Sequence, residues 1–286
     1  MRPEEIGKVG VVGCGIMGSG IVEVVARSGA DVIYVEVSDD RVERGRGAIE
    51  RSTGTAVDKG KLEGEERDRI LGRITGATDL SALADTDLVI EAATEDLETK
   101  KEVFRRLDEL TRPEIVLATN TSSLPIAELG SVTKRPDRII GMHFFNPPPI
   151  MKLLELVVGL ETSEDTYDFA VGYGEHLGKT TVRSKDRAGF IVNFLLVPYL
   201  NSAISMVEQG FATREDIDTA VKLGLGHPMG PLTLMDFIGL DTALSISDVL
   251  YDEFKDPLYS APTLLKRMVA AGHLGRKSGK GFYDYE

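Results

Sequence analysis

A glycine-rich turn near the amino terminus constrains the possible folds of this chain more than any other feature. Residues 8–13 are a short apolar, β-branched run, which is typical of a strand buried in a parallel sheet. The pattern Gly-x-Gly-x-x-Gly follows at Gly13, Gly15 and Gly18, and a helical segment then leads to a second apolar run at residues 31–36. This order predicts a parallel βαβ unit.

The same turn has the chemistry of a dinucleotide site. Glycines permit the tight turn, the close approach of a pyrophosphate and the packing of helix on strand, and the helix N-terminus attracts the phosphates. The predicted cofactor loop consists of Gly13, Gly15, Ile16, Met17 and Gly18. Glu36 ends the second strand, where an acid binds the adenosine ribose and repels a 2′-phosphate, so we expect NAD rather than NADP. The alternative is an ordinary βαβ unit with glycines at a tight turn.

Composition excludes several other classes of protein. The net charge of −13 argues against a broad nucleic-acid or anionic-membrane surface. No apolar stretch approaches the roughly 18 residues of a membrane span, and the amino terminus shows no signal peptide. The single cysteine, Cys14, excludes an intrachain disulfide and fits a reducing compartment. We therefore expect a cytoplasmic protein without a membrane or nucleic-acid partner, and no metal site.

Strands and helices alternate through the first two thirds of the chain. The segments expected to be strands are residues 73–78, 87–93, 115–120 and 179–183, with two more within 138–158. Amphipathic helices are expected at residues 97–110 and 163–177. Within residues 39–72, the glycines at positions 45, 47, 54, 60 and 64 favour a helical hairpin over one continuous helix. This alternation predicts a doubly wound α/β sheet with appended strands.

The pattern changes near residues 185–189, and no convincing strand follows Phe190. Residues 191–209 form a long helix that contains Asn193 and a kinking Pro198. This helix is apolar nearly all round and therefore needs burial on several sides. We expect a Rossmann-type dinucleotide-binding domain at residues 1–186 and an all-α domain at residues 187–286, which achieves that burial by forming a homodimer.

The two apolar runs on either side of the triple-proline corner at 147–149 each carry one polar group, His143 and Glu155. A buried carboxylate needs a partner that offsets its desolvation, and His143 is the nearest candidate. A carboxylate on one imidazole nitrogen orients the ring and stabilises its charged form, so the pair is a candidate general base with its orienter. The alternative is a core histidine and a glutamate exposed on an edge strand.

Seven stretches of the chain resemble the L-3-hydroxyacyl-CoA dehydrogenase family, most closely its 3-hydroxybutyryl-CoA dehydrogenases. They are Gly13-Cys-Gly-Ile-Met-Gly-Ser-Gly, Thr119-Asn-Thr-Ser-Ser, Gly141-Met-His-Phe-Phe-Asn-Pro, Met151-Lys-Leu-Leu-Glu, Gly189-Phe-Ile-Val-Asn, His227-Pro-Met-Gly-Pro and Leu274-Gly-Arg-Lys-Ser-Gly-Lys-Gly-Phe-Tyr. They span nearly the whole chain in family order. The chain departs from the common pattern at Phe194, at Pro147-Pro-Pro-Ile and at His227, which leaves the shape of the acyl pocket open.

The resemblance implies roles for particular residues. His143 is the base that takes the 3-hydroxyl proton and Glu155 its partner, while Ser122 and Asn193 bind the reacting oxygen and the acyl group. The implied contacts to NAD beyond the glycine loop and Glu36 are Glu95, Lys100, Ser122, Asn146 and Lys277. Ser52 and Lys59 match positions that bind coenzyme A. Two of these have ordinary structural alternatives, Ser122 as a turn or helix cap and Asn193 as an amide that packs one helix on another.

The resemblance also implies the reaction, the reversible NAD-dependent oxidation of a (S)-3-hydroxyacyl-CoA, with 3-hydroxybutyryl-CoA and acetoacetyl-CoA as the expected pair. One rival is another β-hydroxyacid dehydrogenase, such as the 3-hydroxyisobutyrate type. Those enzymes rely on a lysine near the start of the long helix, where this chain has Asn193. The other rival is a non-catalytic structural homologue of the lens-crystallin kind, which would be expected to lack a catalytic group.

Overall fold

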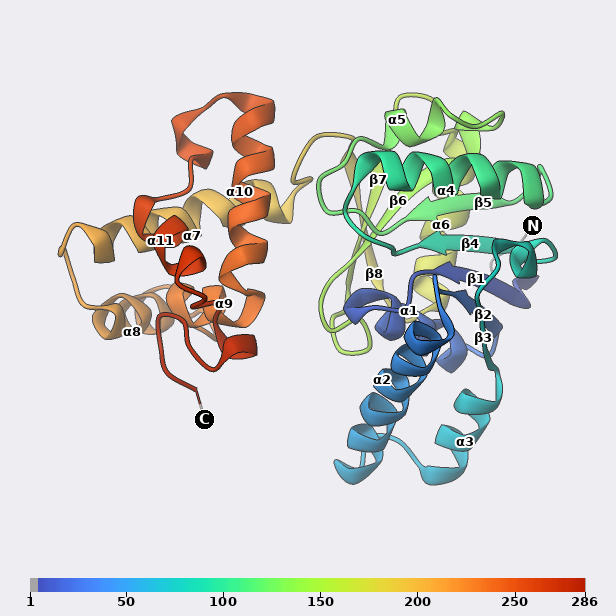
Figure 1. The fold of residues 1–286 in the computed structure, drawn as a ribbon, viewed down its shortest axis with the longest axis horizontal. Helices are drawn as coiled ribbons and strands as arrows, with labels where there is room; N and C mark the ends of the chain where they lie inside the picture. The colour runs from blue at the N-terminus through green and yellow to red at the C-terminus, as the bar shows by residue number, and fades with distance from the viewer. Residues whose placement is uncertain (1–4, 286) are drawn as a thin grey trace. The chain divides into compact units, whose positions relative to one another are not determined.

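The computed structural model describes residues 5–285, and the chain divides into two compact units between Arg187 and Ala188 (Figure 1). The N-terminal unit is built on one eight-stranded sheet in the order β3-β2-β1-β4-β5-β6-β7-β8. The strands are β1 (Lys8–Val12), β2 (Asp31–Val35), β3 (Ile74–Ala77), β4 (Leu88–Glu91), β5 (Val116–Thr119), β6 (Ile139–Phe144), β7 (Leu153–Val158) and β8 (Thr180–Lys185). All neighbours pair in parallel except β6 and β7, so β7 and β8 run opposite to the rest.

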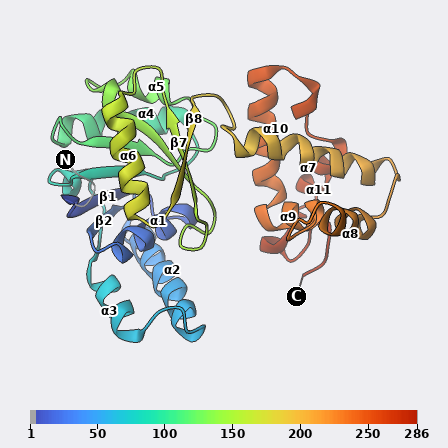
Figure 2. The same ribbon diagram turned by 180° about the vertical axis from the view of Figure 1, so that it is seen from behind.

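Helices cover both faces of this sheet. They are α1 (Ile16–Arg27), α2 (Asp39–Asp58), α3 (Gly64–Gly72), α4 (Leu97–Leu110), α5 (Ile126–Gly130) and α6 (Glu164–His176). Helices α1 and α6 lie on one face, and α4 and α5 lie on the other (Figures 1 and 2). The predicted doubly wound sheet with appended strands is confirmed.

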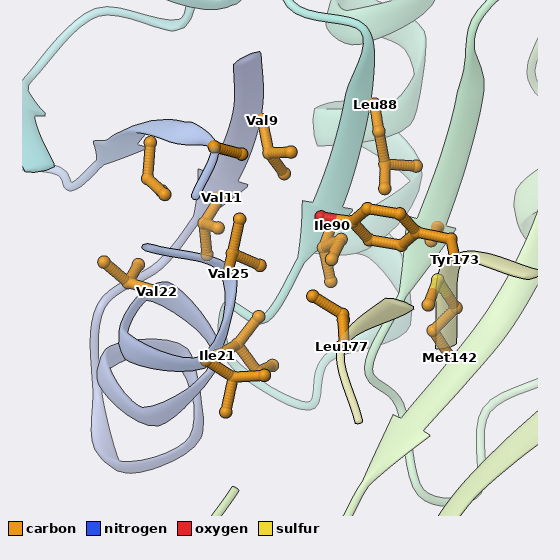
Figure 3. Packing of buried hydrophobic residues seen from close by; sticks show 14 of the residues in the cluster. Val9, Val11, Ile21, Val22, Val25, Leu88, Ile90, Met142, Tyr173 and Leu177 are labelled. Carbon is orange, nitrogen blue, oxygen red and sulfur yellow. The ribbon is translucent and has the colours of Figure 1, made fainter. Parts of the chain in front are cut away.

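One hydrophobic core cluster of the N-terminal unit lies between the sheet and the helices α1 and α6 (Figure 3). This cluster contains Val11 and Ile90 from neighbouring strands, Ile21 of α1, and Tyr173 and Leu177 from the α6 side. Burial of an aliphatic side chain of this size contributes about 1.5–3 kcal/mol relative to exposure. This packing fixes the amino end of α1 at the carboxyl end of β1, which is where the glycine turn lies.

The segment 39–72 forms the expected hairpin of α2 and α3, which projects beyond the sheet (Figures 1 and 2). The break falls at Gly60, whose φ of +63° suits glycine, whereas Gly45 lies inside the unbroken α2. A Cβ atom on Gly45 would stand 2.7 Å from Cys14 Sγ. Gly45 therefore allows α2 to approach the glycine turn closely, which is a packing role that the sequence pattern alone does not separate from a helix break.

The C-terminal unit is helical, as predicted. Its helices are α7 (Val192–Glu208), α8 (Arg214–Gly224), α9 (Pro231–Ile238), α10 (Leu240–Phe254) and α11 (Thr263–Ala270). Pro198 lies inside α7, and Thr213 caps α8 by accepting a hydrogen bond from the Asp216 amide at 3.1 Å. Within residues 5–285 no helix is both long enough and apolar enough to cross a membrane.

Candidate active site

The glycine turn has the geometry of a phosphate-binding loop. Gly13 has φ +87°, and a Cβ atom on Gly18 would stand 2.0 Å from the Gly13 carbonyl oxygen, so both positions need glycine for the turn and for the packing of α1. Gly15, the residue before α1, is different, because its φ is −72° and a Cβ atom there would meet nothing within 4 Å. No neighbour among residues 5–285 requires glycine at this position, so the open space above the helix N-terminus suits the backbone approach of a pyrophosphate.

The rim of the loop also suits a dinucleotide. Glu36 lies just after β2, and its Oε1 accepts a hydrogen bond from the Cys14 amide at 2.7 Å, which holds the carboxylate beside the turn. Ile16 and Val37 are 79 % and 83 % exposed. Large apolar side chains left bare beside such a loop are typical of a surface that a ligand covers. The residues present therefore fit NAD.

Ser122 and Glu95 lie together at the carboxyl ends of β4 and β5. Glu95 Oε1 accepts hydrogen bonds from the Ser122 amide at 2.9 Å and from the Ser122 hydroxyl at 3.2 Å. Lys100 on α4 points at the same group, with its Nζ 3.6 Å from Glu95 Oε2. The Lys100 side chain is only 1 % exposed and donates to both oxygens of Glu91, at 2.7 and 2.8 Å. The fold thus brings three of the proposed cofactor residues together and adds Glu91, which no sequence motif singles out.

His143 and Glu155 face each other directly across the antiparallel strands β6 and β7. Glu155 Oε2 lies 2.7 Å from His143 Nδ1, and the two side chains are 0 % and 8 % exposed. The Phe145 ring packs on the imidazole with a centroid separation of 4.6 Å. A buried carboxylate at this distance fixes the ring orientation and stabilises the charged imidazole, which is the arrangement that a general acid and base needs.

Asn120 connects Ser122 to this histidine and was also missed from the sequence. It lies just after β5, and its side-chain oxygen accepts a hydrogen bond from the Phe144 amide at 2.8 Å. Phe144 is the residue next to His143, so Asn120 ties the end of β5 to the end of β6. The signal available in the sequence was a polar residue directly past a buried strand, where ligands bind in parallel sheets.

The remaining candidate residues of the N-terminal unit lie on exposed segments. Asn146 is exposed on the turn after β6. Ser52 and Lys59 are exposed on α2 and at its C-cap, and their seven-residue separation places them on the same side of the helix two turns apart. These positions are compatible with contact to a large ligand.

The two candidate residues of the C-terminal unit are in different surroundings. Asn193 lies in the first turn of α7 and is 8 % exposed. Lys277 is exposed and donates a hydrogen bond to Asp241 Oδ2 at 2.6 Å. The burial of Asn193 is typical of an amide that hydrogen-bonds one particular group, whereas the exposure of Lys277 leaves its side chain accessible to a ligand.

Comparison with known proteins gives a consistent result over the whole chain. Residues 8–187 match the family model for the NAD binding domain of 3-hydroxyacyl-CoA dehydrogenase, and residues 189–285 match that of its C-terminal domain. A relative from Mycobacterium tuberculosis, 3-hydroxybutyryl-CoA dehydrogenase, is 53 % identical over 99 % of both chains.

Solved structures give the same picture. The crystal structure of M. tuberculosis FadB2 has a TM-score of 0.97 at 53 % identity and covers 98 % of this chain and 99 % of its own. That of (S)-3-hydroxybutyryl-CoA dehydrogenase PaaH1 from Ralstonia eutropha has a TM-score of 0.92 at 44 % identity, with 99 % and 100 % covered. Together with the dinucleotide loop, these matches show that the chain belongs to the 3-hydroxyacyl-CoA dehydrogenase family and is an NAD-dependent oxidoreductase.

Proposed function

We propose that the protein oxidises (S)-3-hydroxybutyryl-CoA to acetoacetyl-CoA reversibly, with His143 as the general base and acid. The observation that carries this proposal is the buried His143–Glu155 pair, with 2.7 Å between Nδ1 and Oε2. NAD, when bound, accepts the hydride from C3 of the substrate. His143 takes the proton of the 3-hydroxyl group during oxidation and returns it during reduction, while Glu155 holds the ring and stabilises its positive charge.

Ser122 and Asn193 bind the reacting oxygen and position the acyl group. The Ser122 hydroxyl is held by Glu95 and belongs to the strand end next to that of His143, which supports this role. Asn193 is a buried amide at the start of α7, and buried amides are retained where they hydrogen-bond a specific partner. Both groups would strengthen their hydrogen bonds as charge develops on the oxygen.

The cofactor and coenzyme A subsites follow the same assignment. The glycine loop, formed by Gly13, Gly15, Ile16, Met17 and Gly18, binds the pyrophosphate, and Glu36 accepts hydrogen bonds from the adenosine ribose. Glu95, Lys100, Ser122, Asn146 and Lys277 form the subsite for the nicotinamide half. Ser52 and Lys59, exposed on one side of the α2 region, contact coenzyme A.

Residues 1–186 act as the cofactor domain, and residues 187–286 act as the substrate and dimerisation domain. Most of the large apolar side chains that remain exposed among the described residues belong to the C-terminal unit, including Leu195, Phe211, Leu223, Leu225 and Leu258. Exposed apolar surface of this kind is typical of an interface, and a two-fold dimer would bury it. The location is cytoplasmic, because a single buried cysteine suits a reducing compartment.

A turnover assay tests the substrate assignment. Purified protein is mixed with NADH and 3-ketoacyl-CoA substrates of increasing acyl length, and the loss of NADH absorbance is followed. The expected result is the highest kcat/KM with acetoacetyl-CoA. A maximum at a longer acyl chain would contradict the short-chain assignment while leaving the reaction intact. Absence of turnover with every thioester, with NADH still bound, would favour a non-catalytic homologue.

A further inference from the structure

Glu91 is a buried carboxylate whose two oxygens are both occupied by donors from other segments. It ends β4 and is 0 % exposed. Its Oε1 accepts hydrogen bonds from the Ala93 amide and the Lys100 ammonium, both at 2.7 Å. Its Oε2 accepts from Lys100 at 2.8 Å and from the Thr119 hydroxyl at 2.6 Å. Because a carboxylate buried without donors is strongly unfavourable, these hydrogen bonds hold the donors in place.

A first path leads from Glu91 to Ser122. Lys100, held by Glu91, lies 3.6 Å from Glu95 Oε2. The other oxygen of Glu95 accepts from the Thr121 hydroxyl at 2.6 Å and from the amide and hydroxyl of Ser122. The orientation of the Ser122 hydroxyl therefore depends on Glu95, and Glu95 is held in turn by a lysine that Glu91 positions.

Two shorter paths lead from the same residue to the other strand ends. The Glu91 carbonyl accepts a hydrogen bond from the Asn120 amide at 2.7 Å, and the Asn120 side chain accepts from Phe144, next to His143. The Ala93 backbone, bonded to the Glu91 carboxylate, lies against the glycine turn, since a Cβ atom on Gly13 would stand 2.8 Å from the Ala93 Cα atom. Glu91 thus joins the turns that follow β1, β4, β5 and β6.

We propose that Glu91 is a positioning residue of the active site. It touches neither substrate nor cofactor but orients the Ser122 hydroxyl through Lys100 and Glu95, so that the site is preorganised before the reactants bind. This inference rests on the proposed function where it assigns Ser122 to the reacting oxygen. The network itself is a property of the free protein and can be tested there.

Another buried ion pair of the same unit, between Asp108 and Arg135, provides a matched control. Asp108 and Arg135 are 6 % and 7 % exposed, with Arg135 Nε 2.8 Å from Asp108 Oδ1. The other hydrogen bonds of Arg135 go to Thr111 and to backbone carbonyls near the end of α4. Asp108→Asn therefore disturbs an ion pair that is about as buried as Glu91–Lys100, but it changes none of the hydrogen bonds that lead to Ser122.

Hydrogen exchange of the free protein is the first test, because it needs no turnover. The Ala93 amide is bonded to Glu91 and the Ser122 amide to Glu95. In Glu91→Gln both amides should exchange about tenfold faster or more, because the Ala93 amide loses its charged acceptor and Lys100 no longer holds Glu95, the acceptor of the Ser122 amide. In Asp108→Asn their exchange should be unchanged. Equal exchange in wild type and Glu91→Gln would overturn the proposal.

A double-mutant cycle on turnover is the second test. With NADH saturating, Glu91→Gln should lower kcat/KM for the thioester about tenfold or more in the wild type, but less than about twofold in a Ser122→Ala background, because the end of the path is then absent. Asp108→Asn should leave kcat/KM near the wild-type value. A purely structural role for Glu91 predicts the same loss in both backgrounds, and that result would overturn the proposal.

The milder variant Thr119→Val covers the case in which Glu91→Gln does not fold. It removes one donor to Glu91 Oε2 and nearly keeps the side-chain volume. It should therefore raise the exchange rates of the Ala93 and Ser122 amides, and lower kcat/KM in the same cycle, to a smaller extent than Glu91→Gln. Wild-type exchange rates at both amides in Thr119→Val would contradict the network. If the wild type turns over no 3-ketoacyl-CoA but the exchange results hold, the proposed function fails and the positioning role of Glu91 stands.

Discussion

Two of the buried carboxylate–cation pairs in the N-terminal unit differ in the chemistry of the cation. Glu155 meets His143 through one 2.7 Å contact across β6 and β7. Glu91 meets Lys100 through both of its oxygens, at 2.7 and 2.8 Å. An imidazole has a second ring nitrogen that can take up and release a proton, whereas an ammonium group acts only as a hydrogen-bond donor. The two pairs are similarly buried, but the His143–Glu155 pair is suited to proton transfer, whereas the Lys100–Glu91 pair is suited to holding neighbouring groups in place.

The largest expected effect is the loss of turnover when the imidazole is removed. His143→Gln should lower kcat by about 10² or more, the usual contribution of a general acid or base. The glutamine amide can still donate to Glu155, and the glycine loop is untouched, so NADH affinity and the thermal midpoint should stay near wild type. Stopped-flow kinetics, NADH fluorescence titration and thermal melting check these three quantities. A variant with near-normal kcat would remove His143 from its role.

Removal of the other cation should affect stability first. Lys100→Met leaves the Glu91 carboxylate buried without its ion pair, at a cost of about 3–5 kcal/mol, which lowers the thermal midpoint by roughly 6–20 °C. The neighbouring Lys101 pairs with the exposed Glu98 and Glu128, so Lys101→Met should change the midpoint little. Equal midpoints for the two variants would show that Glu91 does not depend on Lys100.

A third carboxylate sharpens the contrast, because Glu36 is bonded to backbone amides rather than to a cation. The wild type should prefer NADH over NADPH by more than about tenfold, which corresponds to more than ~1.4 kcal/mol. Glu36→Gln should narrow this preference, since the charge that repels the 2′-phosphate is removed. The ratio of kcat/KM for the two cofactors measures the effect, and equal use of both by the wild type would contradict the assignment.

The smallest expected effect concerns the thiol beside Glu36. Burial, and to a lesser extent the negative charge of Glu36, raises the pKa of Cys14 to about 12. The thiol therefore stays protonated at pH 8, and native protein should react with iodoacetamide far more slowly than denatured protein. Glu36→Gln should increase the native rate only slightly, because burial is the main cause. A native rate equal to the denatured rate would show that Cys14 is accessible.

The sequence predicted the order of strands and helices because apolar periodicity and glycine turns act over short distances. It also predicted the His143–Glu155 pair, because a carboxylate in an apolar run needs a partner and a short connection joins the two strands. The same argument applies to Glu91 at the end of its apolar run. Its partner Lys100 lies in a helix segment rich in charged residues, however, so nothing in the sequence distinguished it from a solvated lysine.

Other parts of the site depend on contacts that local patterns do not contain. The burial of Lys100 to 1 % exposure results from the packing of α4 on the sheet. Gly45 lies inside α2 because Cys14 occupies the space of its Cβ atom. The bond between Asn120 and the Phe144 amide depends on the pairing of β5 with β6. Each requires the relative placement of segments that are distant in the chain, and a local pattern does not provide it.

The pH dependence of turnover in both directions tests the proton-transfer role of His143 most directly. Oxidation of 3-hydroxybutyryl-CoA needs the neutral imidazole and reduction of acetoacetyl-CoA needs the charged one, so kcat should rise with pH in the first direction and fall with pH in the second. Glu155→Gln should lower both rates, because the amide orients the ring without stabilising its charge. In His143→Gln the opposite trends should disappear. If that variant keeps the wild-type pH profiles in both directions, His143 is not the group that exchanges the proton.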